Sequence, residues 1–171
     1  MNERISGTLV FTDLAGFTAF TAERGDEAAV ALVEQFESLV RGVLPPSGRV
    51  VKQLGDGLFL FVPDAAEAVA AMLSLADTTE LASSPDAPLW VRTGIHAGTA
   101  LPRGTDLLGH DVNVAARITD LAAAGEVLVS ESARALAGLS VARFQRLAPA
   151  YVKGIAEPLR LFRATPISVP V

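Results

Sequence analysis

Hydrophobic and polar positions follow two different periods along this chain. Runs rich in β-branched and aromatic residues, bounded by glycine, proline or charged residues, predict strands at 5–14, 49–62, 89–100, 126–130, 141–147 and 159–163. Residues 26–44 instead carry apolar side chains at helical spacing, and Pro45 ends that stretch. The chain therefore alternates between strand-like and helix-like segments.

Further helices are predicted between these strands. Residues 65–82 form an alanine-rich stretch, which Asp64 is expected to cap at its N-terminus. Asp111 is expected to cap a helix over residues 112–124, and Ser130 a helix that ends near Ala137. Alternating strands and helices with at least one hairpin indicate an α+β fold with a mostly antiparallel sheet.

Composition narrows the class of protein. The 171 residues are half apolar, which suits one domain, expected over residues 1–165 with a flexible tail at 166–171. The net charge of −5 argues against nucleic acid as a partner, and the absence of cysteine excludes disulfides and thiolate chemistry. The N-terminus has no signal-peptide core, and no uncharged apolar run approaches the length of a membrane span. We expect a soluble cytoplasmic protein without a membrane partner.

The segment VKQLGDGLFLFV, residues 51–62, is the strongest local signal. Its Gly55-Asp56-Gly57 sequence predicts a tight antiparallel hairpin. On an extended strand, the even spacing of Lys52 and Asp56 would place both side chains on one face, about 13 Å apart. That distance is too long for an ion pair and suits opposite ends of a ligand, or two different sites.

The end of the first strand is a second candidate position. The sequence FTDLAGFT, residues 11–18, delivers Asp13 at the strand's end and turns at Gly16. The residues from Phe17 onward predict a helix start, whose free N–H groups suit phosphate oxygens. A helix N-cap role for Asp13 is the alternative.

Three further segments carry candidate polar side chains. Asn113 and Arg117 are four residues apart and so share one face of the predicted helix. Arg92 and His96 share one face of the strand over 89–100, and a single histidine on a strand is more often structural than catalytic. Lys153 lies beside a flexible turn at Gly154.

Together these segments resemble the class III nucleotidyl cyclase catalytic domain. The resemblance rests on FTDLAGFT, KQLGDG, VRTGIHAG and GHDVNVAAR, in that order, and extends from Thr8 to about Arg163. It implies a ferredoxin-like core with a mostly antiparallel sheet covered by helices. It also implies an enzyme that cyclises ATP to 3′,5′-cyclic AMP with release of pyrophosphate.

The resemblance assigns the metal and phosphate contacts. Asp13 and Asp56 match aspartates that hold two divalent cations, Mg or Mn, and the Leu14 carbonyl resembles a further metal contact. The backbone from Ala15 through Phe17 and Thr18 resembles the triphosphate contacts. Arg92 and Lys153 resemble the cations that hold the β- and γ-phosphates.

The resemblance also assigns the base, the ribose and the transition state. Lys52 and Asp106 match a pair that selects adenine, whose N1 accepts a hydrogen bond and whose N6 donates one. Asn113 matches a residue that orients the ribose, and Arg117 one that stabilises the transition state. The segment before Asp106 is shorter than is usual in the family, and Leu108 replaces an aromatic residue often found there.

In this family each site is shared across a dimer. The metal aspartates come from one protomer, and the lysine, base-selecting aspartate, asparagine and arginine come from the other, so a homodimer has two sites. Two alternatives stay open: a guanylate cyclase, which Lys52 and Asp106 disfavour, and a non-catalytic nucleotide-binding or dimerisation module.

Overall fold

The computed structural model describes residues 3–168. Its strands are β1 (Ile5–Leu14), β2 (Arg49–Leu54), β3 (Gly57–Val62), β4 (Val91–Arg103), β5 (Asp106–Leu108), β6 (Val127–Ser130), β7 (Arg143–Arg146) and β8 (Leu161–Thr165). Its helices are α1 (Phe17–Arg24), α2 (Asp26–Val43), α3 (Ala65–Ala82), α4 (His110–Leu121) and α5 (Glu131–Ala137). The segments predicted from the sequence pattern are present, with bounds that shift by a few residues.

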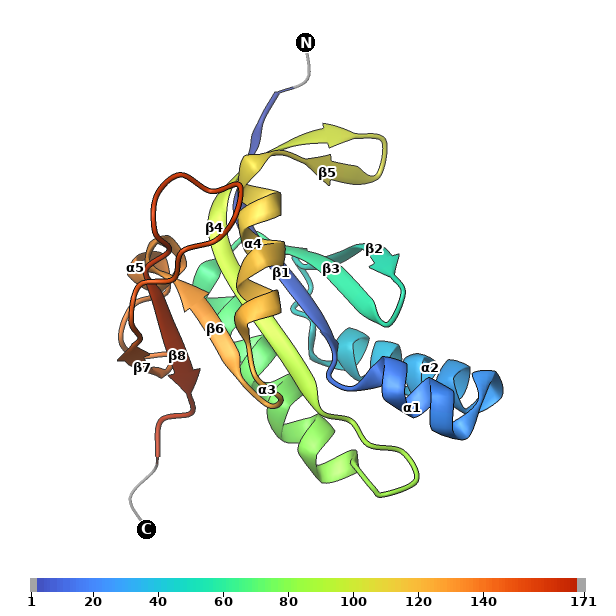
Figure 1. Ribbon diagram of the computed structural model, residues 1–171. Helices are drawn as coiled ribbons and strands as arrows, with labels where there is room; N and C mark the ends of the chain where they lie inside the picture. The colour runs from blue at the N-terminus through green and yellow to red at the C-terminus, as the bar shows by residue number, and fades with distance from the viewer. Residues whose placement is uncertain (1–2, 169–171) are drawn as a thin grey trace.

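The strands form one sheet in the order β2-β3-β1-β4-β6-β8-β7, and β5 pairs with β4 outside this path. Neighbouring strands are antiparallel except for β4 and β6, which are parallel and joined through α4. β1 lies between β3 and β4 in this order, and in Figure 1 it runs through the middle of the molecule. The predicted α+β class with a mostly antiparallel sheet is confirmed.

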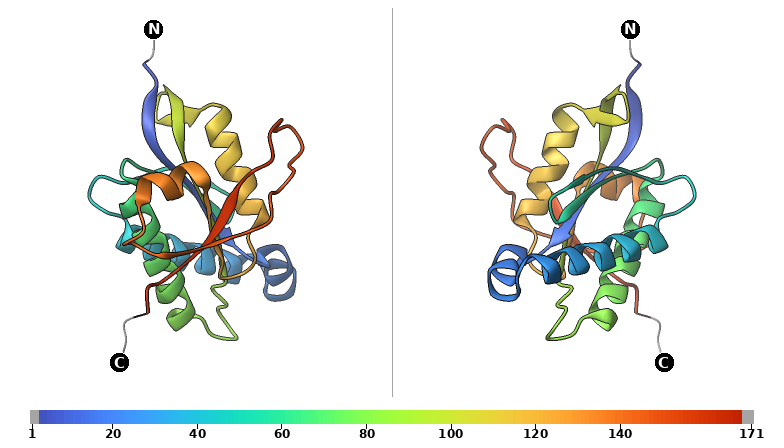
Figure 2. Two further views of the ribbon diagram at one scale, coloured as in Figure 1. Left: turned by 90° about the vertical axis from the view of Figure 1, so that its left-hand side faces the viewer. Right: turned by 90° about the vertical axis from the view of Figure 1, so that its right-hand side faces the viewer.

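The helices cover both faces of the sheet. On one face, Phe36 of α2 and Met72 of α3 pack with Leu60 and Ile95 in the largest buried cluster. On the other face, α4 packs against β1, β4 and β6, with Ile118 fully buried. Both views of Figure 2 place α3 and α4 on opposite sides of the sheet. None of the helices within residues 3–168 is long and apolar enough to cross a membrane.

Two helix starts behave as predicted. The Asp64 side chain accepts a hydrogen bond from the Glu67 N–H, and Ser130 accepts one from the Ala133 N–H, so each caps its helix. The predicted cap at Asp111 is wrong. α4 begins at His110, and the Asp111 carboxylate turns from its first turn toward β4, where it accepts from the Thr99 N–H.

Two other expectations need correction. The strand expected over 89–100 continues to Arg103 and turns at Gly104 (φ 62°) into β5, which forms the hairpin arm at the top of Figure 1. Asp56 does not share a strand face with Lys52, because β2 ends at Leu54 and Asp56 lies in the turn. Of the tail expected from residue 166 onward, residues 166–168 have no regular secondary structure and residues 169–171 lie outside the described residues.

Candidate active site

The first group of candidate residues gathers where β1 ends. Asp13 is the penultimate residue of β1, and Asp56 lies in the β2–β3 turn, where its Oδ2 accepts from the Leu14 N–H at 3.2 Å. Both carboxylates line a cavity of about 320 Å³, which we call the carboxylate pocket. Its lining residues are Asp13, Leu14, Ala15, Gly16, Phe17, Thr18, Asp56 and Arg92. The structure thus brings together every metal-site residue expected from the sequence.

Asp13 is paired with a guanidinium from the neighbouring strand. Asp13 and Arg92 are directly opposite each other in the β1–β4 register. The Arg92 Nε and Nη2 donate to the two carboxylate oxygens of Asp13 at 2.8 Å each, and this hydrogen bonding raises the pKa of Arg92. Each oxygen of Asp13 therefore accepts one hydrogen bond from Arg92 and keeps a further lone pair.

The pocket disfavours the ionised form of the Asp56 carboxylate. Burial raises its pKa, and the charge of Asp13 raises it further, against the lowering effect of backbone hydrogen bonds. A divalent cation between the two carboxylates would relieve both causes, and their oxygens are the donors that Mg²⁺ and Mn²⁺ prefer. Within residues 3–168 no three acidic or histidine side chains form a preformed metal cluster. The acidic side chains that line this pocket are thus Asp13 and Asp56.

The turn after β1 closes the other side of the carboxylate pocket. Gly16 adopts φ 73°, a left-handed conformation that favours glycine, and α1 begins at the next residue, Phe17. No side chain caps this helix, so its first-turn N–H groups are available to an acceptor. Phe17 and Thr18 therefore present backbone donors beside the carboxylates, as an anionic triphosphate requires.

A second cavity, which we call the helix pocket, lies along α4. It has a volume of about 450 Å³ and is lined by His110, Asn113, Ala116, Arg117, Asp120, Lys153, Gly154 and Ile155. Asn113 and Arg117 project from the exposed face of α4, and Lys153 comes from the segment between β7 and β8. Arg117 approaches Asp120 only at 3.8 Å, and both side chains are more than half exposed. The guanidinium is therefore free to meet a ligand.

The predicted base-selecting residues lie together on a third surface. Lys52 of β2 donates from Nζ to Oδ2 of Asp106 on β5 at 2.9 Å, and this hydrogen bond lowers the pKa of Asp106. The Leu107 N–H holds the second oxygen of Asp106 at 2.8 Å. The short arm between β4 and β5 thus still places Asp106 beside Lys52.

The three groups do not share one cavity, although a further cavity is lined by Asp13 together with Ala116 and Asp120. The carboxylate pocket and the helix pocket share no lining residue, and neither is lined by Lys52 or Asp106. The structure therefore brings Arg92 to the predicted metal aspartates, and Lys153 to Asn113 and Arg117. It does not unite these two sets in one cavity.

Sequence reasoning missed two titratable side chains of the helix pocket. His110 and Asp120 lie three residues before Asn113 and three after Arg117, so all four follow one face of α4. This helical spacing was the available signal, which the expected Asp111 cap obscured.

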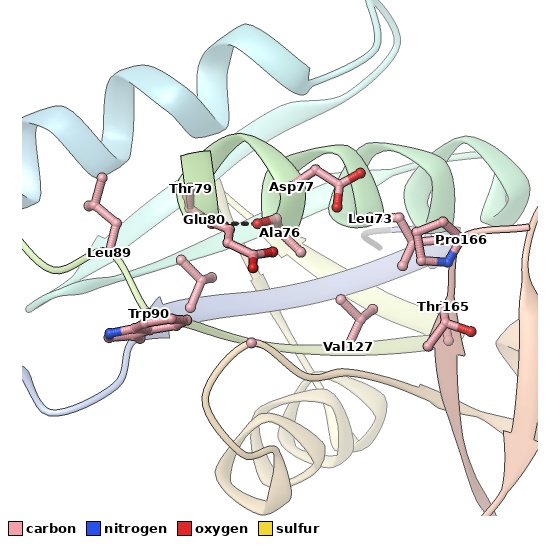
Figure 3. Close-up of a pocket in the computed structure, with 13 residues that line it drawn as sticks. Leu73, Ala76, Asp77, Thr79, Glu80, Leu89, Trp90, Val127, Thr165 and Pro166 are labelled. Atoms are coloured by element: carbon pink, nitrogen blue, oxygen red, sulfur yellow. Dashed lines mark hydrogen bonds between the residues drawn. The ribbon is translucent and has the colours of Figure 1, made fainter. Parts of the chain in front are cut away.

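A further cavity of about 140 Å³ lies between α3 and the ends of β4, β6 and β8 (Figure 3). It is mainly apolar, with Leu73, Leu89 and Val127 in its lining and Glu80 and Trp90 near its mouth. None of the predicted site residues lines it. A backbone hydrogen bond from the Ala15 N–H to the Trp90 carbonyl at 2.7 Å links it to the carboxylate pocket.

Comparison with known proteins identifies the family. The profile of the adenylate and guanylate cyclase catalytic domain matches residues 2–163, and this chain belongs to that family. A pH-sensitive adenylate cyclase from Mycobacterium tuberculosis is 31% identical over 160 residues, covering 91% of this chain and 40% of the relative. An adenylate cyclase from Streptomyces coelicolor is 38% identical over 120 residues, covering 70% of this chain and 31% of the relative. The chain thus spans less than half the length of these relatives.

Solved structures show the same fold. The crystal structure of the adenylyl cyclase CyaB from P. aeruginosa aligns with a TM-score of 0.87 at 23% identity, covering 98% of this chain and 97% of that one. The guanylyl cyclase Cya2 aligns with a TM-score of 0.84 at 19% identity, covering 99% and 96%. The fold is therefore that of the class III cyclases, as the sequence motifs implied.

Proposed function

We propose that this chain is an adenylate cyclase that converts ATP to 3′,5′-cyclic AMP and pyrophosphate. The ribose 3′-oxygen attacks the α-phosphorus in line and forms a new P–O bond to it. The bond between the α-phosphorus and the oxygen that bridges to the β-phosphate breaks, and the 3′-hydroxyl proton is released. Relatives named as adenylate cyclases support this assignment. The observation that carries it is the division of the required groups between two separate pockets.

The division favours a homodimer with two shared sites. One chain offers carboxylates in one pocket and an exposed Asn113, Arg117 and Lys153 in the other. A twofold axis that faces the carboxylate pocket of one protomer with the helix pocket of its partner would complete two equivalent sites. A single chain would have none.

The carboxylate pocket would hold two divalent cations, Mg or Mn, through Asp13, Asp56 and the Leu14 carbonyl. Bound there, such ions supply Lewis-acid chemistry that acidifies the 3′-hydroxyl and neutralises the leaving triphosphate. Arg92, released from Asp13, would hold the β- and γ-phosphates together with the first-turn N–H groups of Phe17 and Thr18.

The helix pocket would supply orientation and charge. Asn113 would hold the ribose so that its 3′-oxygen keeps the attack line. Arg117 would donate to the α-phosphate oxygens as negative charge develops there, and Lys153 would bind the outer phosphates. The free, exposed guanidinium of Arg117 suits this role because it has no tight internal partner.

Lys52 and Asp106 would select adenine from the same protomer as Asn113 and Arg117. Lys52 would donate to adenine N1, and Asp106 would accept from the N6 amino group. Guanine reverses both polarities, with a donor at N1 and an acceptor at O6, and would leave both side chains mismatched. The 2.9 Å ion pair between the two side chains supports this assignment, because it keeps them close enough to meet one base edge.

Purified protein incubated with ATP or GTP, each with Mg²⁺ and with Mn²⁺, tests the proposal. We expect cyclic AMP and pyrophosphate in equal amounts from ATP, and much less product from GTP. A preference for GTP would make the chain a guanylate cyclase. Nucleotide binding without product in either metal would identify a non-catalytic nucleotide-binding module.

A further inference from the structure

Helix α4 is fixed to the sheet at both of its ends. Near its C-terminus, Thr119 donates through Oγ1 to the Phe11 carbonyl at 3.2 Å and packs where Gly94 lacks a side chain. Near its N-terminus, Asp111 packs against Gly98, and an added Cβ at Gly98 would collide with its carboxylate. Asn113 and Arg117 lie between these two attachments.

The N-terminal attachment is a pair of hydrogen bonds to β4. The Oδ2 of Asp111 accepts from the Thr99 N–H at 2.8 Å, and its Oδ1 lies 3.2 Å from Nε2 of His96. No side chain caps α4, whose N-cap residue is Gly109. Asp111 therefore does not cap the helix, but connects its first turn to β4 instead.

The other ring nitrogen of His96 also has hydrogen-bond partners. Its Nδ1 lies 2.8 Å from the Ser130 Oγ, which also accepts from the Ala133 N–H at the start of α5. Ser132 donates to the Ala97 carbonyl at 2.9 Å and stays 3.4 Å from the same ring nitrogen. A neutral imidazole with its proton on Nε2 satisfies this network, since Nδ1 then accepts from Ser130 and Nε2 donates to Asp111.

We propose that Asp111 and His96 are positioning residues, which together with Thr99 form a clamp between α4 and β4. The clamp fixes the position of α4 on the sheet, and therefore the positions of Asn113 and Arg117, as catalysis requires. This inference rests on the proposed cyclase function and adds to it two residues that touch neither substrate nor metal. The clamp is defined by the Asp111, His96 and Thr99 contacts.

The clamp should act on kcat rather than on substrate affinity. Without the Asp111 carboxylate, the Thr99 N–H and the His96 Nε2–H lose their acceptor, and the first turn of α4 loses its tether to β4. A displacement of about 1 Å in a positioning element is enough to lower a rate substantially. The proposed cation and phosphate contacts of the carboxylate pocket come from β1, α1, β4 and the β2–β3 turn, not from α4.

Asp111→Ala tests the clamp. We expect kcat to fall about tenfold while the KM for ATP changes less than about twofold. The matched control is Asp64→Ala, which removes another aspartate that holds a helix N-terminus, by its hydrogen bond from the Glu67 N–H at 2.9 Å. The control should lower thermal stability and leave kcat unchanged. An unchanged kcat in Asp111→Ala would overturn the clamp.

Mixed dimers localise the effect. When Asp111→Ala protein is mixed with Asp13→Ala protein, each heterodimer has one complete site. That site combines the intact carboxylate pocket of the Asp111→Ala chain with the intact helix pocket of the Asp13→Ala chain. Activity should then match a reference mixture of Asp13→Ala and Arg117→Ala proteins. A mixture of Asp111→Ala with Arg117→Ala should gain nothing over the Asp111→Ala chain alone.

The mixtures separate the clamp from the function it rests on. Recovery in the reference mixture without recovery in the Asp111→Ala and Asp13→Ala mixture means a general folding defect, and the clamp is refuted. An inactive reference mixture refutes the shared site itself, and the clamp with it.

Two further variants cover other outcomes. Asp111→Asn keeps an acceptor for Thr99 and offers an N–H to the other imidazole tautomer, so it should retain kcat within about threefold of wild type. A loss as large as that of alanine would contradict a hydrogen-bonded clamp. If Asp111→Ala does not fold, Asp111→Ser, which is too short to reach both partners, replaces it with the same expected results.

Discussion

The carboxylate pocket and the helix pocket differ in how their charges are balanced. In the first, Asp13 is held by two hydrogen bonds from Arg92, and Asp56 by the N–H of Leu14. In the second, Asn113, Arg117 and Lys153 are exposed, and Arg117 has only a loose contact with Asp120. In the first pocket each carboxylate has a hydrogen-bond partner within the chain, whereas the second pocket presents exposed donors.

This difference indicates which pocket must change on binding. In the carboxylate pocket, the proposed cation would compete with Arg92 for the oxygens of Asp13, and a displaced guanidinium would be available to phosphate. In the helix pocket, Arg117 has a 3.8 Å contact with Asp120 and no closer ionic partner within residues 3–168, so the proposed substrate and second protomer would displace little.

The largest effect should come from removing a carboxylate. Asp13→Ala deletes an oxygen donor and leaves Arg92 without its partner, so kcat/KM for ATP should fall at least about a thousandfold with either metal. Calorimetric titration with Mn²⁺ should show weakened binding in parallel. Asp86→Ala, which removes an exposed partner of Arg24, is the control and should behave as wild type. Residual activity within tenfold of wild type would contradict a metal role for Asp13.

Removing the guanidinium of the helix pocket should have the next largest effect. Arg117→Ala should lower kcat about a hundredfold with little change in the KM for ATP, because its donors act on charge that develops in the transition state. Arg41→Ala, which breaks an exposed ion pair on α2, serves as a charge-matched control. A raised KM with unchanged kcat would make Arg117 an anchor for bound substrate instead.

A smaller effect is expected at the base-selecting pair. Asp106→Ala should lower the ratio of kcat/KM for ATP over GTP about tenfold, since the acceptor for the adenine amino group is lost while GTP loses a mismatch. Arg49→Ala is the local control, because it removes only an exposed hydrogen bond to the Thr105 carbonyl in the same arm. An unchanged ratio would show that base choice resides elsewhere.

The smallest effect concerns stability and pH. Burial lowers the pKa of His96 below its ordinary value of 6.5, although Asp111 opposes this and nearby His110 adds to it. The unfolded chain therefore binds a proton at a higher pH than the folded chain does. Stability from this group is complete above about pH 6.5 and is lost below it, by at most about 1.4 kcal/mol per pH unit.

Thermal unfolding of wild type and His96→Gln between pH 7.5 and 5.5 measures this contribution. The wild type should lose more stability on acidification than the variant. Equal slopes in the two proteins would show that His96 titrates alike in the folded and unfolded chains.

The sequence predicted much of the fold because its signals are local. The Gly55-Asp56 turn, the caps at Asp64 and Ser130 and the helical stripe of α2 each depend on residues close together in the chain. The Asp111 cap was wrong because its partners, Thr99 and His96, belong to another element. Local capping propensity does not show that β4 competes with the helix N-terminus for the Asp111 carboxylate.

The candidate site could be predicted as a set of residues but not as an arrangement. Motifs gave Asp13, Asp56, Asn113 and Arg117 their expected roles. The Asp13–Arg92 pair depends on the β1–β4 register, and the separation of the two pockets depends on the packing of α4 across the sheet. Neither is encoded by spacing within one segment.

The central claim is that each site takes one pocket from each of two chains. The most direct measurement is cyclic AMP formation by an equimolar mixture of Asp13→Ala and Arg117→Ala proteins. With random assembly, half of the dimers carry one complete site, so activity should return to about a quarter of the wild-type level. A mixture as inactive as its two components would contradict the claim.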